Sequence, residues 1–385
     1  MSLATSDHPV ARLPEEWSAL LSEWGERPYR ARQIFQWIHK RGVMDPAQMT
    51  DLGKTLRERL AELGLTPPAR VADVYRSSDG TRKLLLEMNE GARVECVVIP
   101  MTRAKGDALA PDGEEDNEDE DAAVGRERVT LCVSTQFGCA MGCVFCASGQ
   151  AGLMRGLGAH EIVAQVLMAR EYLEPQEDLK NLVFMGMGEP LHHYDQTVRA
   201  LRLLTHPEGF GMSPRRITVS SVGLVPGIRK LGADFAGKIG LAISLHAPDD
   251  ATRDRIIPMN RRYPLTELLQ ALRDYPLPKR RRITIEYTVI DGINDSVAHA
   301  EQLVRLLRGL RVKVNLIPMN SIPNSELGAP EEDRVQAFRD HLVGAGLSCF
   351  LRLRRGDDVA AACGQLAMAD ELVARRRLQL APAAG

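Results

Sequence analysis

Short apolar, β-rich runs recur along the chain from residue 128 onward and alternate with amphipathic helical segments. The expected strands are 129–134, 181–186, 216–221, 239–246, 282–290, 312–320 and 348–354. The expected helices between them are 159–171, 194–205, 265–275, 297–308 and 331–345. Because strands that alternate with helices build parallel βα units, six or seven such units predict an α/β fold, a full or partial (β/α) barrel rather than an open doubly wound sheet.

Two other patterns precede this barrel. Residues 14–66 read as helical, with Ile34, Trp37 and Ile38 on one face; a second stripe consists of Met49, Leu52, Leu56 and Leu60. Residues 70–100 alternate in strand fashion, which favours two or three antiparallel strands. We therefore expect an N-terminal helical accessory domain (1–68), a small antiparallel β unit (69–100), an acidic insert (101–127), the barrel with a C-terminal segment (128–368) and a tail (369–385).

The net charge of −2 is set largely by one tract. Residues 112–121, DGEEDNEDED, carry eight acidic side chains, so the rest of the chain has −2 + 8 = +6. The total therefore does not exclude a nucleic-acid substrate. The tract itself predicts a disordered, solvated loop; a phosphate mimic that regulates RNA access is the alternative. The basic clusters are Arg27–Arg32, Lys40–Arg41, Arg215–Arg216, Arg261–Arg262, Lys279–Arg282, Arg352–Arg355 and Arg375–Arg377, and RNA contact or plain solvation suits each.

The composition is that of an ordinary globular protein, which excludes collagenous, coiled-coil and wholly disordered classes. No run reaches the roughly 18 apolar residues of a membrane span, and residues 1–17 lack the apolar core of a signal peptide. Three of the seven cysteines fall within eight residues. We therefore expect metal or redox chemistry in a reducing cytosol rather than a disulfide scaffold.

The strongest chemical signal is the run Cys139-Ala-Met-Gly-Cys143-Val-Phe-Cys146, which follows the first barrel strand. Structural zinc sites and ferredoxin-type 4Fe-4S clusters normally take four protein ligands. Three cysteines leave one iron of a cluster open for a cofactor. This C-x3-C-x2-C spacing is the signature of radical S-adenosylmethionine (radical SAM) enzymes, whose open iron binds that cofactor; a zinc site is the alternative.

A second signal, Met-Gly-Met-Gly-Glu189-Pro190, follows the second barrel strand. The third glycine of the dinucleotide fingerprint is absent. Glycines at a strand end let the backbone approach a ligand closely, and Glu189 can accept a hydrogen bond from the ammonium of a bound amino acid. Two further cysteines, Cys132 in the first barrel strand and Cys363 near the C-terminus, suit either a chemical role or the role of a small buried hydrophobe, which is also the interpretation for Cys96 and Cys349.

These motifs resemble those of the RlmN-type dual-specificity RNA methyltransferases. The resemblance runs from about Pro28 to about Leu366, apart from the acidic insert. The matching segments are TLCVSTQFGCAMGCVFC, FMGMGEPL, VSSVGLVPGI, ISLHAP, DGINDS, NLIPMN and RGDDVAAACGQL. The C8-methylating relatives carry Ala after the Glu of GMGE, where this chain has Pro190, so the C2 type fits better.

The resemblance implies methylation of C2 of adenine 2503 in 23S rRNA and of adenine 37 in tRNA, with two S-adenosylmethionine molecules per turnover. It implies that Cys139, Cys143 and Cys146 hold a 4Fe-4S cluster. Cys363 takes a methyl group, Cys132 resolves the RNA adduct by forming a disulfide with Cys363, and Glu95 accepts a proton. The contacts to S-adenosylmethionine that the resemblance implies are Gly188, Glu189, Ser220, Ser244, Leu245, His246 and Asn320. Without the resemblance, His246 would suit a structural histidine and Asn320 a turn residue.

The implied partners are the two RNA substrates and an electron donor such as flavodoxin or ferredoxin, and we expect a cytoplasmic monomer with no membrane contact. Two rivals stay open at this point. One is a C8-methylating rRNA methyltransferase of the same superfamily. The other is a non-enzymatic iron–sulfur or zinc module that binds RNA.

Overall fold

The computed structural model describes residues 8–101, 126–322, 325–352 and 355–366. The acidic tract 112–121 and the tail therefore lie outside the described residues, as do Arg354 and Arg375–Arg377. No helix of the described part is long and apolar enough to cross a membrane.

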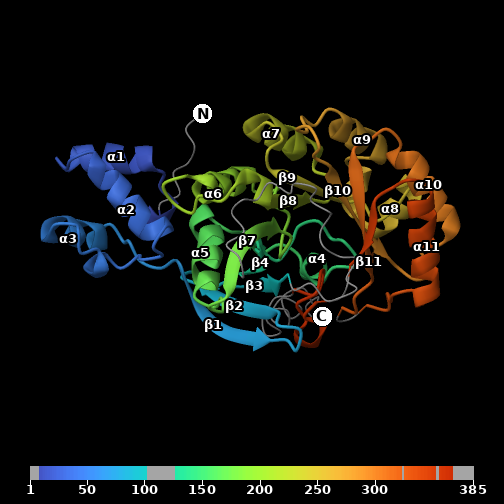
Figure 1. Cartoon of the computed structure of the whole chain (residues 1–385), viewed down its shortest axis with the longest axis horizontal. Coiled ribbons are helices and arrows are strands. Elements are labelled where there is room, and N and C mark those ends of the chain that lie inside the picture. Colours follow the sequence, from blue (N-terminus) through green and yellow to red (C-terminus); the bar gives the residue numbers. More distant parts are fainter. Residues whose placement is uncertain (1–7, 102–125, 323–324, 353–354, 367–385) are drawn as a thin grey trace, which may run out of the picture.

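The N-terminal residues form the expected helical domain, at one end of the molecule (Figure 1). Its helices are α1 (Pro14–Glu23), α2 (Tyr29–His39) and α3 (Lys54–Glu62), with short 3-10 turns at Pro9–Ala11 and Pro46–Gln48. Ile34 and Ile38 are buried on α2, as their spacing predicts. Met49 and Leu52 are buried too, but they precede α3 because that helix begins only after Gly53.

Ten strands form one sheet among the described residues, in the order β1-β2-β3-β4-β7-β8-β9-β10-β11-β12. The first three are β1 (Ala69–Arg76), β2 (Arg82–Met88) and β3 (Arg93–Pro100), and they pair antiparallel. The parallel strands are β4 (Glu127–Cys132), β7 (Glu177–Phe184), β8 (Ile217–Ser221), β9 (Gly240–Ser244), β10 (Ile283–Val289), β11 (Val312–Pro318) and β12 (Cys349–Leu351). This sequential parallel order is the predicted partial (β/α) barrel.

The antiparallel unit continues the barrel sheet, because β3 pairs antiparallel with β4. Two buried side chains reinforce the junction: Arg82 on β2 donates to both carboxylate oxygens of Glu177 at 2.7 Å. A separate ribbon joins β5 (Gln136–Phe137) to β6 (Arg155–Gly156). The division of the chain into domains stays a prediction.

Helices cover one face of the sheet. The larger ones are α5 (Ala159–Arg170), α6 (Tyr194–Thr205), α7 (Val225–Phe235), α9 (Leu265–Arg273), α10 (Val297–Leu307) and α11 (Glu332–Gly344); α4 (Ala147–Ala151) and α8 (Asp250–Ile256) are short. All five predicted helices are confirmed. The sequence pattern missed α7, in which Gly227 and Gly232 interrupt the apolar periodicity; a Cβ on Gly227 would lie 2.7 Å from Leu191.

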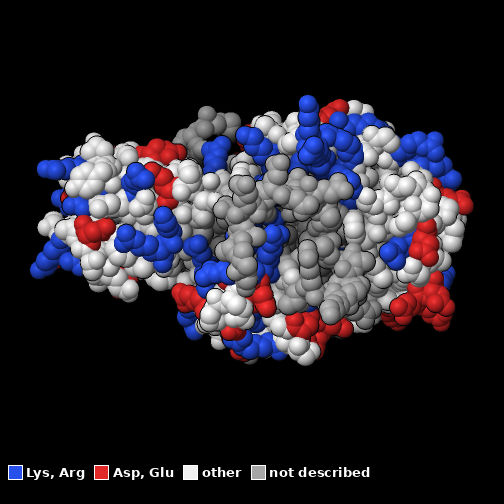
Figure 2. Space-filling view, viewed as in Figure 1, with Lys and Arg blue, Asp and Glu red and all other residues white. Residues whose placement is uncertain are grey.

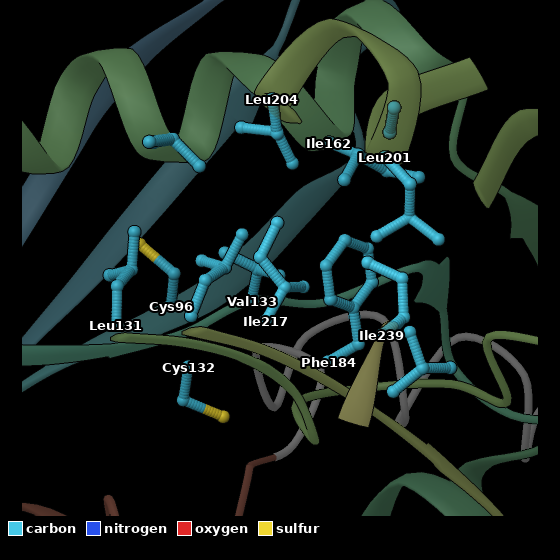
Figure 3. Close-up of a cluster of buried hydrophobic side chains, with 14 of the residues drawn as sticks. Cys96, Leu131, Cys132, Val133, Ile162, Phe184, Leu201, Leu204, Ile217 and Ile239 are labelled. Carbon is cyan, nitrogen blue, oxygen red and sulfur yellow. The ribbon is translucent and has the colours of Figure 1, made fainter. Parts of the chain in front are cut away.

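The two faces of the sheet differ in chemistry. Leu131, Phe184 and Ile217 point into an apolar layer with Ile162 and Leu204 from the helices (Figure 3). Cys132 points to the opposite face (Figure 3). By strand alternation, that face also carries the polar side chains Thr130, Asn181, Thr218, Ser220, Ser244, Glu286 and Asn315. A polar inner face is suited to a binding site rather than to a packed core.

Candidate active site

The three cysteines of the C-x3-C-x2-C run lie on the loop between β5 and α4. The loop is tightly held at its start: Gly138 has φ +78°, and a Cβ there would come within 1.9 Å of the Gly152 carbonyl oxygen. At its end, the backbone N–H groups of Ser148 and Gly149 donate to the Cys146 sulfur. These hydrogen bonds favour the thiolate, the form that binds metals.

The donor set fits an iron–sulfur cluster better than a single ion. The three thiols interact electrostatically in every pairing, and burial raises the pKa of each. Yet in the described ranges no three His, Cys, Asp or Glu side chains come close enough to hold one metal ion. A tetrahedral zinc site would need sulfurs about 3.8 Å apart, whereas a cluster binds each cysteine through a different iron. Three cysteines are one ligand short of a structural zinc site, whereas in a 4Fe-4S cluster they would leave one iron open.

Gly188 and Glu189 follow β7 and lie beside this loop. The Glu189 carboxylate accepts from the backbone N–H of Leu191 at 3.1 Å and of Val222 at 2.8 Å. Burial raises the pKa of Glu189 to about 7, although those hydrogen bonds oppose the rise. Glu189 also interacts electrostatically with Cys139 and Cys143, so it stands next to the proposed cluster.

The glycines of this motif allow close packing within the protein. A Cβ on Gly186 would lie 2.6 Å from the Ser134 hydroxyl, and one on Gly188, at φ +107°, would lie 2.6 Å from Gln136. Protein atoms therefore fill the space next to both. The glycines let this turn pack against the chain after β4; that the backbone here also approaches a ligand closely stays a prediction.

The next predicted cofactor contacts lie at the ends of β8 and β9. The Ser220 hydroxyl donates to the Phe184 carbonyl at 2.7 Å. Ser244 ends β9 and Leu245 is fully buried after it. His246 follows at φ +56°, a conformation that ends the strand two residues earlier than predicted. Strand ends at one edge of a barrel are where its active sites form.

The His246 ring is buried and neutral. Its Nδ1 accepts from the Thr288 backbone N–H at 2.8 Å, and burial lowers its pKa to about 3. The neutral ring therefore carries its proton on Nε2. The ring also meets Phe145 of the cysteine loop edge-on, with centroids 4.5 Å apart. His246 thus has structural partners, as the sequence pattern allowed, and its Nε2–H is the group to consider for the cofactor.

The C-terminal segment 355–366 runs between the β1–β2 turn and the cysteine loop. Asp79 accepts from the Gly356 N–H at 3.0 Å, and Lys83 donates to the Ala360 carbonyl at 3.3 Å. At the other end, the Ala147 N–H donates to the Gly364 carbonyl at 2.9 Å. Asn320 donates to the Cys363 carbonyl at 3.0 Å, while its buried Oδ1 has no hydrogen-bond partner among the described residues.

This segment brings Cys363 to Cys132. The two thiols interact electrostatically with each other and both with Arg352. Cys363 is exposed, and Cys132 is buried at the end of β4. Burial raises the pKa of Cys132 to about 12; protein packed around Cys363 raises its pKa also, and Arg352 opposes that rise. All seven cysteines are free, so no disulfide joins this pair in the structure.

Glu95 shares the face of Cys132. Val97 on β3 pairs directly with Cys132, and Glu95 lies two residues earlier on the same strand, so all three point to one side. The Glu95 carboxylate is nearly buried and lies 2.9 Å from Lys83 Nζ. The orientation that the sequence pattern left open is therefore toward the inner face of the sheet. Cys96, one residue on, is buried in the opposite, apolar layer, as is Cys349 in its own part of the core.

Sequence reasoning missed a polar group beside Cys363. The buried Glu286 on β10 accepts from Asn315 at 3.0 Å, and Arg352 lies 3.9 Å from the same oxygen. Its other oxygen has no hydrogen-bond partner among the described residues. The signal was present in the sequence, because Thr284, Glu286 and Thr288 are polar at alternate positions of a strand whose other residues are apolar.

Comparisons with known protein families and solved structures identify the superfamily to which this fold and cysteine loop belong. The profile of the radical SAM superfamily matches residues 133–307, and that of the ribosomal RNA large subunit methyltransferase N-terminal domain matches residues 14–65. A crystal structure of a radical SAM methyltransferase from Sphaerobacter thermophilus superposes with a TM-score of 0.82 at 42% identity, over 93% of this chain and 98% of that one. The fold and the three-cysteine loop thus define a radical SAM protein.

Similar curated proteins show to which family within the radical SAM superfamily the chain belongs. The dual-specificity RNA methyltransferase RlmN of Sorangium cellulosum is 60% identical over 95% of this chain and 96% of its own length. The protein of the same name from Anaeromyxobacter dehalogenans is 45% identical, over 95% and 94%. This chain belongs to the RlmN family of dual-specificity RNA methyltransferases.

Proposed function

We propose that this protein methylates C2 of adenine 2503 in 23S rRNA and of adenine 37 in tRNA. The observation that carries the proposal is the meeting of Cys132 and Cys363 beside the cysteine loop, in a chain that matches RNA methyltransferases over almost its whole length. A methyl-carrying thiol needs a second thiol within reach for its release, and nothing in the fold alone would require that pairing.

The residues that would hold the cofactors lie along one edge of the sheet. Cys139, Cys143 and Cys146 would bind three irons of a 4Fe-4S cluster and leave the fourth open. S-adenosylmethionine would lie against Gly188, Glu189, Ser220, Ser244, Leu245, His246 and Asn320. When bound, the two supply a 5′-deoxyadenosyl radical, which removes a hydrogen atom from a methyl group carried by the protein.

Cys363 is the proposed carrier of that methyl group. Its thiolate attacks the methyl carbon of one S-adenosylmethionine and S-adenosylhomocysteine leaves, so the thiol must first lose its proton. Arg352 interacts with this thiol and favours its ionised form. Among the seven cysteines only Cys363 is an exposed residue, which suits approach by a cofactor and then by the adenine of the RNA.

Glu95 and Cys132 would complete the reaction. Once the methylene radical on Cys363 has added to adenine C2, the adduct must lose one electron, which the oxidised cluster would take up, and its C2 proton, for which Glu95 is the proposed acceptor. The Cys132 thiolate then attacks the Cys363 sulfur, the bond from that sulfur to the new carbon breaks, and a Cys132–Cys363 disulfide remains. The released carbon takes up a proton and becomes the methyl group. An external thiol reductant must restore both cysteines before the next turnover.

RNA would reach this edge with the target base unstacked. Lys and Arg side chains gather over the region of α7 and α9 on one face of the molecule (Figure 2), and Arg27, Arg32, Lys40 and Arg41 are exposed on the N-terminal domain. Such groups would bind phosphates in a salt-dependent manner. We further propose a cytoplasmic monomer reduced by a flavodoxin- or ferredoxin-type donor.

Product analysis tests the proposed reaction. The anaerobically reconstituted protein is incubated with S-adenosylmethionine, a reductant and 23S rRNA or tRNA in separate reactions, and the nucleosides are resolved by mass spectrometry and chromatography. We expect 2-methyladenosine from both RNAs. 8-Methyladenosine as the sole product would instead establish the C8 rival, and iron-free protein that leaves S-adenosylmethionine intact would establish a binding module.

A narrower experiment tests Cys363. Peptide mapping of active protein by mass spectrometry should find one added methyl on the peptide that contains Cys363. The variant Cys132→Ala should accumulate protein crosslinked to RNA because the adduct cannot be resolved. Active protein without methyl on that peptide would contradict the carrier role, whatever the product.

A further inference from the structure

Arg253 on α8 is a buried guanidinium at the point where the cysteine loop meets the sheet. It is 1% exposed. Its Nε donates to the Leu245 carbonyl at 2.9 Å, and its Nη2 donates to the carbonyls of Val222 at 2.6 Å and Ser244 at 3.1 Å. Its Nη1 donates to the Asn260 side chain at 2.7 Å. Each of these four acceptors is a neutral oxygen.

No carboxylate forms an ion pair with this guanidinium among the described residues. The nearby Asp250 and Asp254 carboxylates are engaged by Asn260, whose Nδ2 donates to both, at 2.9 and 2.6 Å. Burial lowers the pKa of Arg253 to about 10, which still leaves it charged at neutral pH. Asp250 and Asp254 act on this charge electrostatically without forming an ion pair with it. A buried charge that lacks a direct ion pair is costly, and carbonyl dipoles offset only part of that cost.

The largest electrostatic partner of Arg253 lies on the cysteine loop. Arg253 and Cys143 interact electrostatically, and each favours the ionised form of the other. The loop is also joined to α8 through the backbone, because the Val144 N–H donates to the Ile256 carbonyl at 3.1 Å. Cys143 itself packs in one apolar cluster with Val222, Ile256 and Ile257. The guanidinium therefore faces a low-dielectric region in which charges act strongly on each other.

We propose that Arg253 is the internal counter-ion of the cluster bound by Cys139, Cys143 and Cys146, and that its charge favours the reduced state of that cluster. This inference rests on the proposed function, since it needs the cluster. Reduction adds one negative charge at the cluster, and a fixed positive charge beside it lowers the free energy of that state. Surrounding charge is one of the factors that set cluster potentials.

The same hydrogen bonds give Arg253 a positioning role. Val222 also donates its N–H to Glu189, and Ser244 and Leu245 are proposed cofactor contacts. One side chain thus holds the ends of β8 and β9 at fixed distances from the cysteine loop. The charge and the hydrogen bonds are separable by substitution, because Lys keeps the charge with a different donor geometry and Gln keeps a donor without the charge.

The test compares Arg253→Met, Arg253→Gln and Arg253→Lys with the matched control Arg255→Met. Arg255 is on the same helix and is exposed. Each protein is reconstituted anaerobically, its iron content is measured, and the reduced fraction of the cluster is followed by electron paramagnetic resonance during a redox titration. We expect the Met and Gln variants to show at least a tenfold lower ratio of reduced to oxidised cluster at a fixed potential, a shift of about 59 mV for one electron.

The Lys variant and the Arg255 control should stay within threefold of the unsubstituted protein. Neutral variants that titrate like the unsubstituted protein would overturn the inference, as would a Lys variant shifted as far as the Met variant. If neither neutral variant retains iron, retention by the Lys variant supports the counter-ion role, and iron loss from all three Arg253 variants overturns it. Absence of a cluster from the unsubstituted protein would instead reject the proposed function, and this inference with it.

Discussion

Gly188 illustrates how a single residue shapes the site. Its φ of +107° is outside the range that L side chains readily adopt, and Gln136 fills the position of a Cβ. The Gln136 side chain in turn accepts from the Glu189 N–H at 2.9 Å. The glycine therefore fixes the backbone that places the Glu189 carboxylate next to the cysteine loop.

We expect Gly188→Ala to lower the free energy of unfolding by more than about 2 kcal/mol, because it adds both backbone strain and overlap with Gln136. Gly292→Ala is the control: Gly292 has φ +65° but nothing within 4 Å of a Cβ, so strain alone should cost about 1 kcal/mol. Denaturant unfolding of the two variants measures the difference. Equal losses would show that the contact with Gln136 is harmless.

For single residues, the sequence allowed the candidate site residues to be predicted, but not the side chains and carbonyl groups that they contact in the fold. The cysteine run, Glu189 and His246 were recognisable because their spacing is local. The free oxygen of Glu286 and the carbonyl contacts of Arg253 depend on strands and helices that are distant in sequence, so no local pattern reveals them. For Glu95, register decided the orientation, and register follows from the pairing of Val97 with Cys132.

Among the elements, α2 joins the N-terminal domain to the barrel through an apolar and aromatic seam. His39 at the end of α2 is fully buried against Phe35 and Phe210, and a Cβ on Gly209 would lie 2.8 Å from Phe35 and 3.0 Å from His39. Burial, with a smaller contribution from the nearby His206, lowers the pKa of His39 to about 3. The folded protein thus keeps this imidazole neutral.

This seam predicts a pH dependence of stability. In the unfolded chain His39 takes up a proton below its ordinary pKa of 6.5, whereas in the folded protein it does so only near pH 3. Stability is therefore lost as the pH falls from about 6.5 toward 3, by about 1.4 kcal/mol per pH unit. His39→Leu should lack this contribution, so the difference in unfolding free energy between the two proteins should vary with pH below 6.5 and be constant above 7.5. Parallel pH profiles would contradict the buried neutral imidazole.

The elements themselves were predicted well wherever their periodicity is regular. The seven barrel strands and five helices have that regularity, and the structure contains all of them. Two strands differ most in extent: β7 begins at Glu177 instead of 181, and β12 spans only Cys349–Leu351 of the expected 348–354. The pattern failed at α7, where glycines serve close packing against Leu191, and at α8, which is too short to show a helical period. Tertiary contacts decided both cases.

Considered as a whole molecule, the antiparallel strands and the barrel share one sheet, and the acidic insert interrupts that sheet between β3 and β4. Pro100 pairs with Val129, and the Met101 N–H donates to the Arg128 carbonyl at 2.8 Å. The two ends of the insert are therefore hydrogen-bonded neighbours. A few residues can join them, as in a β-hairpin.

We expect deletion of residues 104–124 to leave iron content and methylation of both RNAs largely unchanged, because the shortened loop can still close the β3–β4 pair. The deletion changes the net charge from −2 to +6, since its one Lys and nine acidic residues sum to −8. Iron analysis and nucleoside analysis measure the outcome. Loss of both would show that the insert belongs to the catalytic machinery.

The attachment of the C-terminal segment has a consequence for how this chain can vary in length. Ala360 is held by Lys83, and Gly364 is held by Ala147, with Cys363 between them. The sulfur can therefore travel little farther than rotation of its own side chain allows. One inserted residue would add up to about 3.5 Å of slack, more than the length of either hydrogen bond. The length of the segment from 360 to 364 thus determines where the Cys363 thiol lies. Insertions or deletions that other loops tolerate should therefore displace the thiol and impair function here.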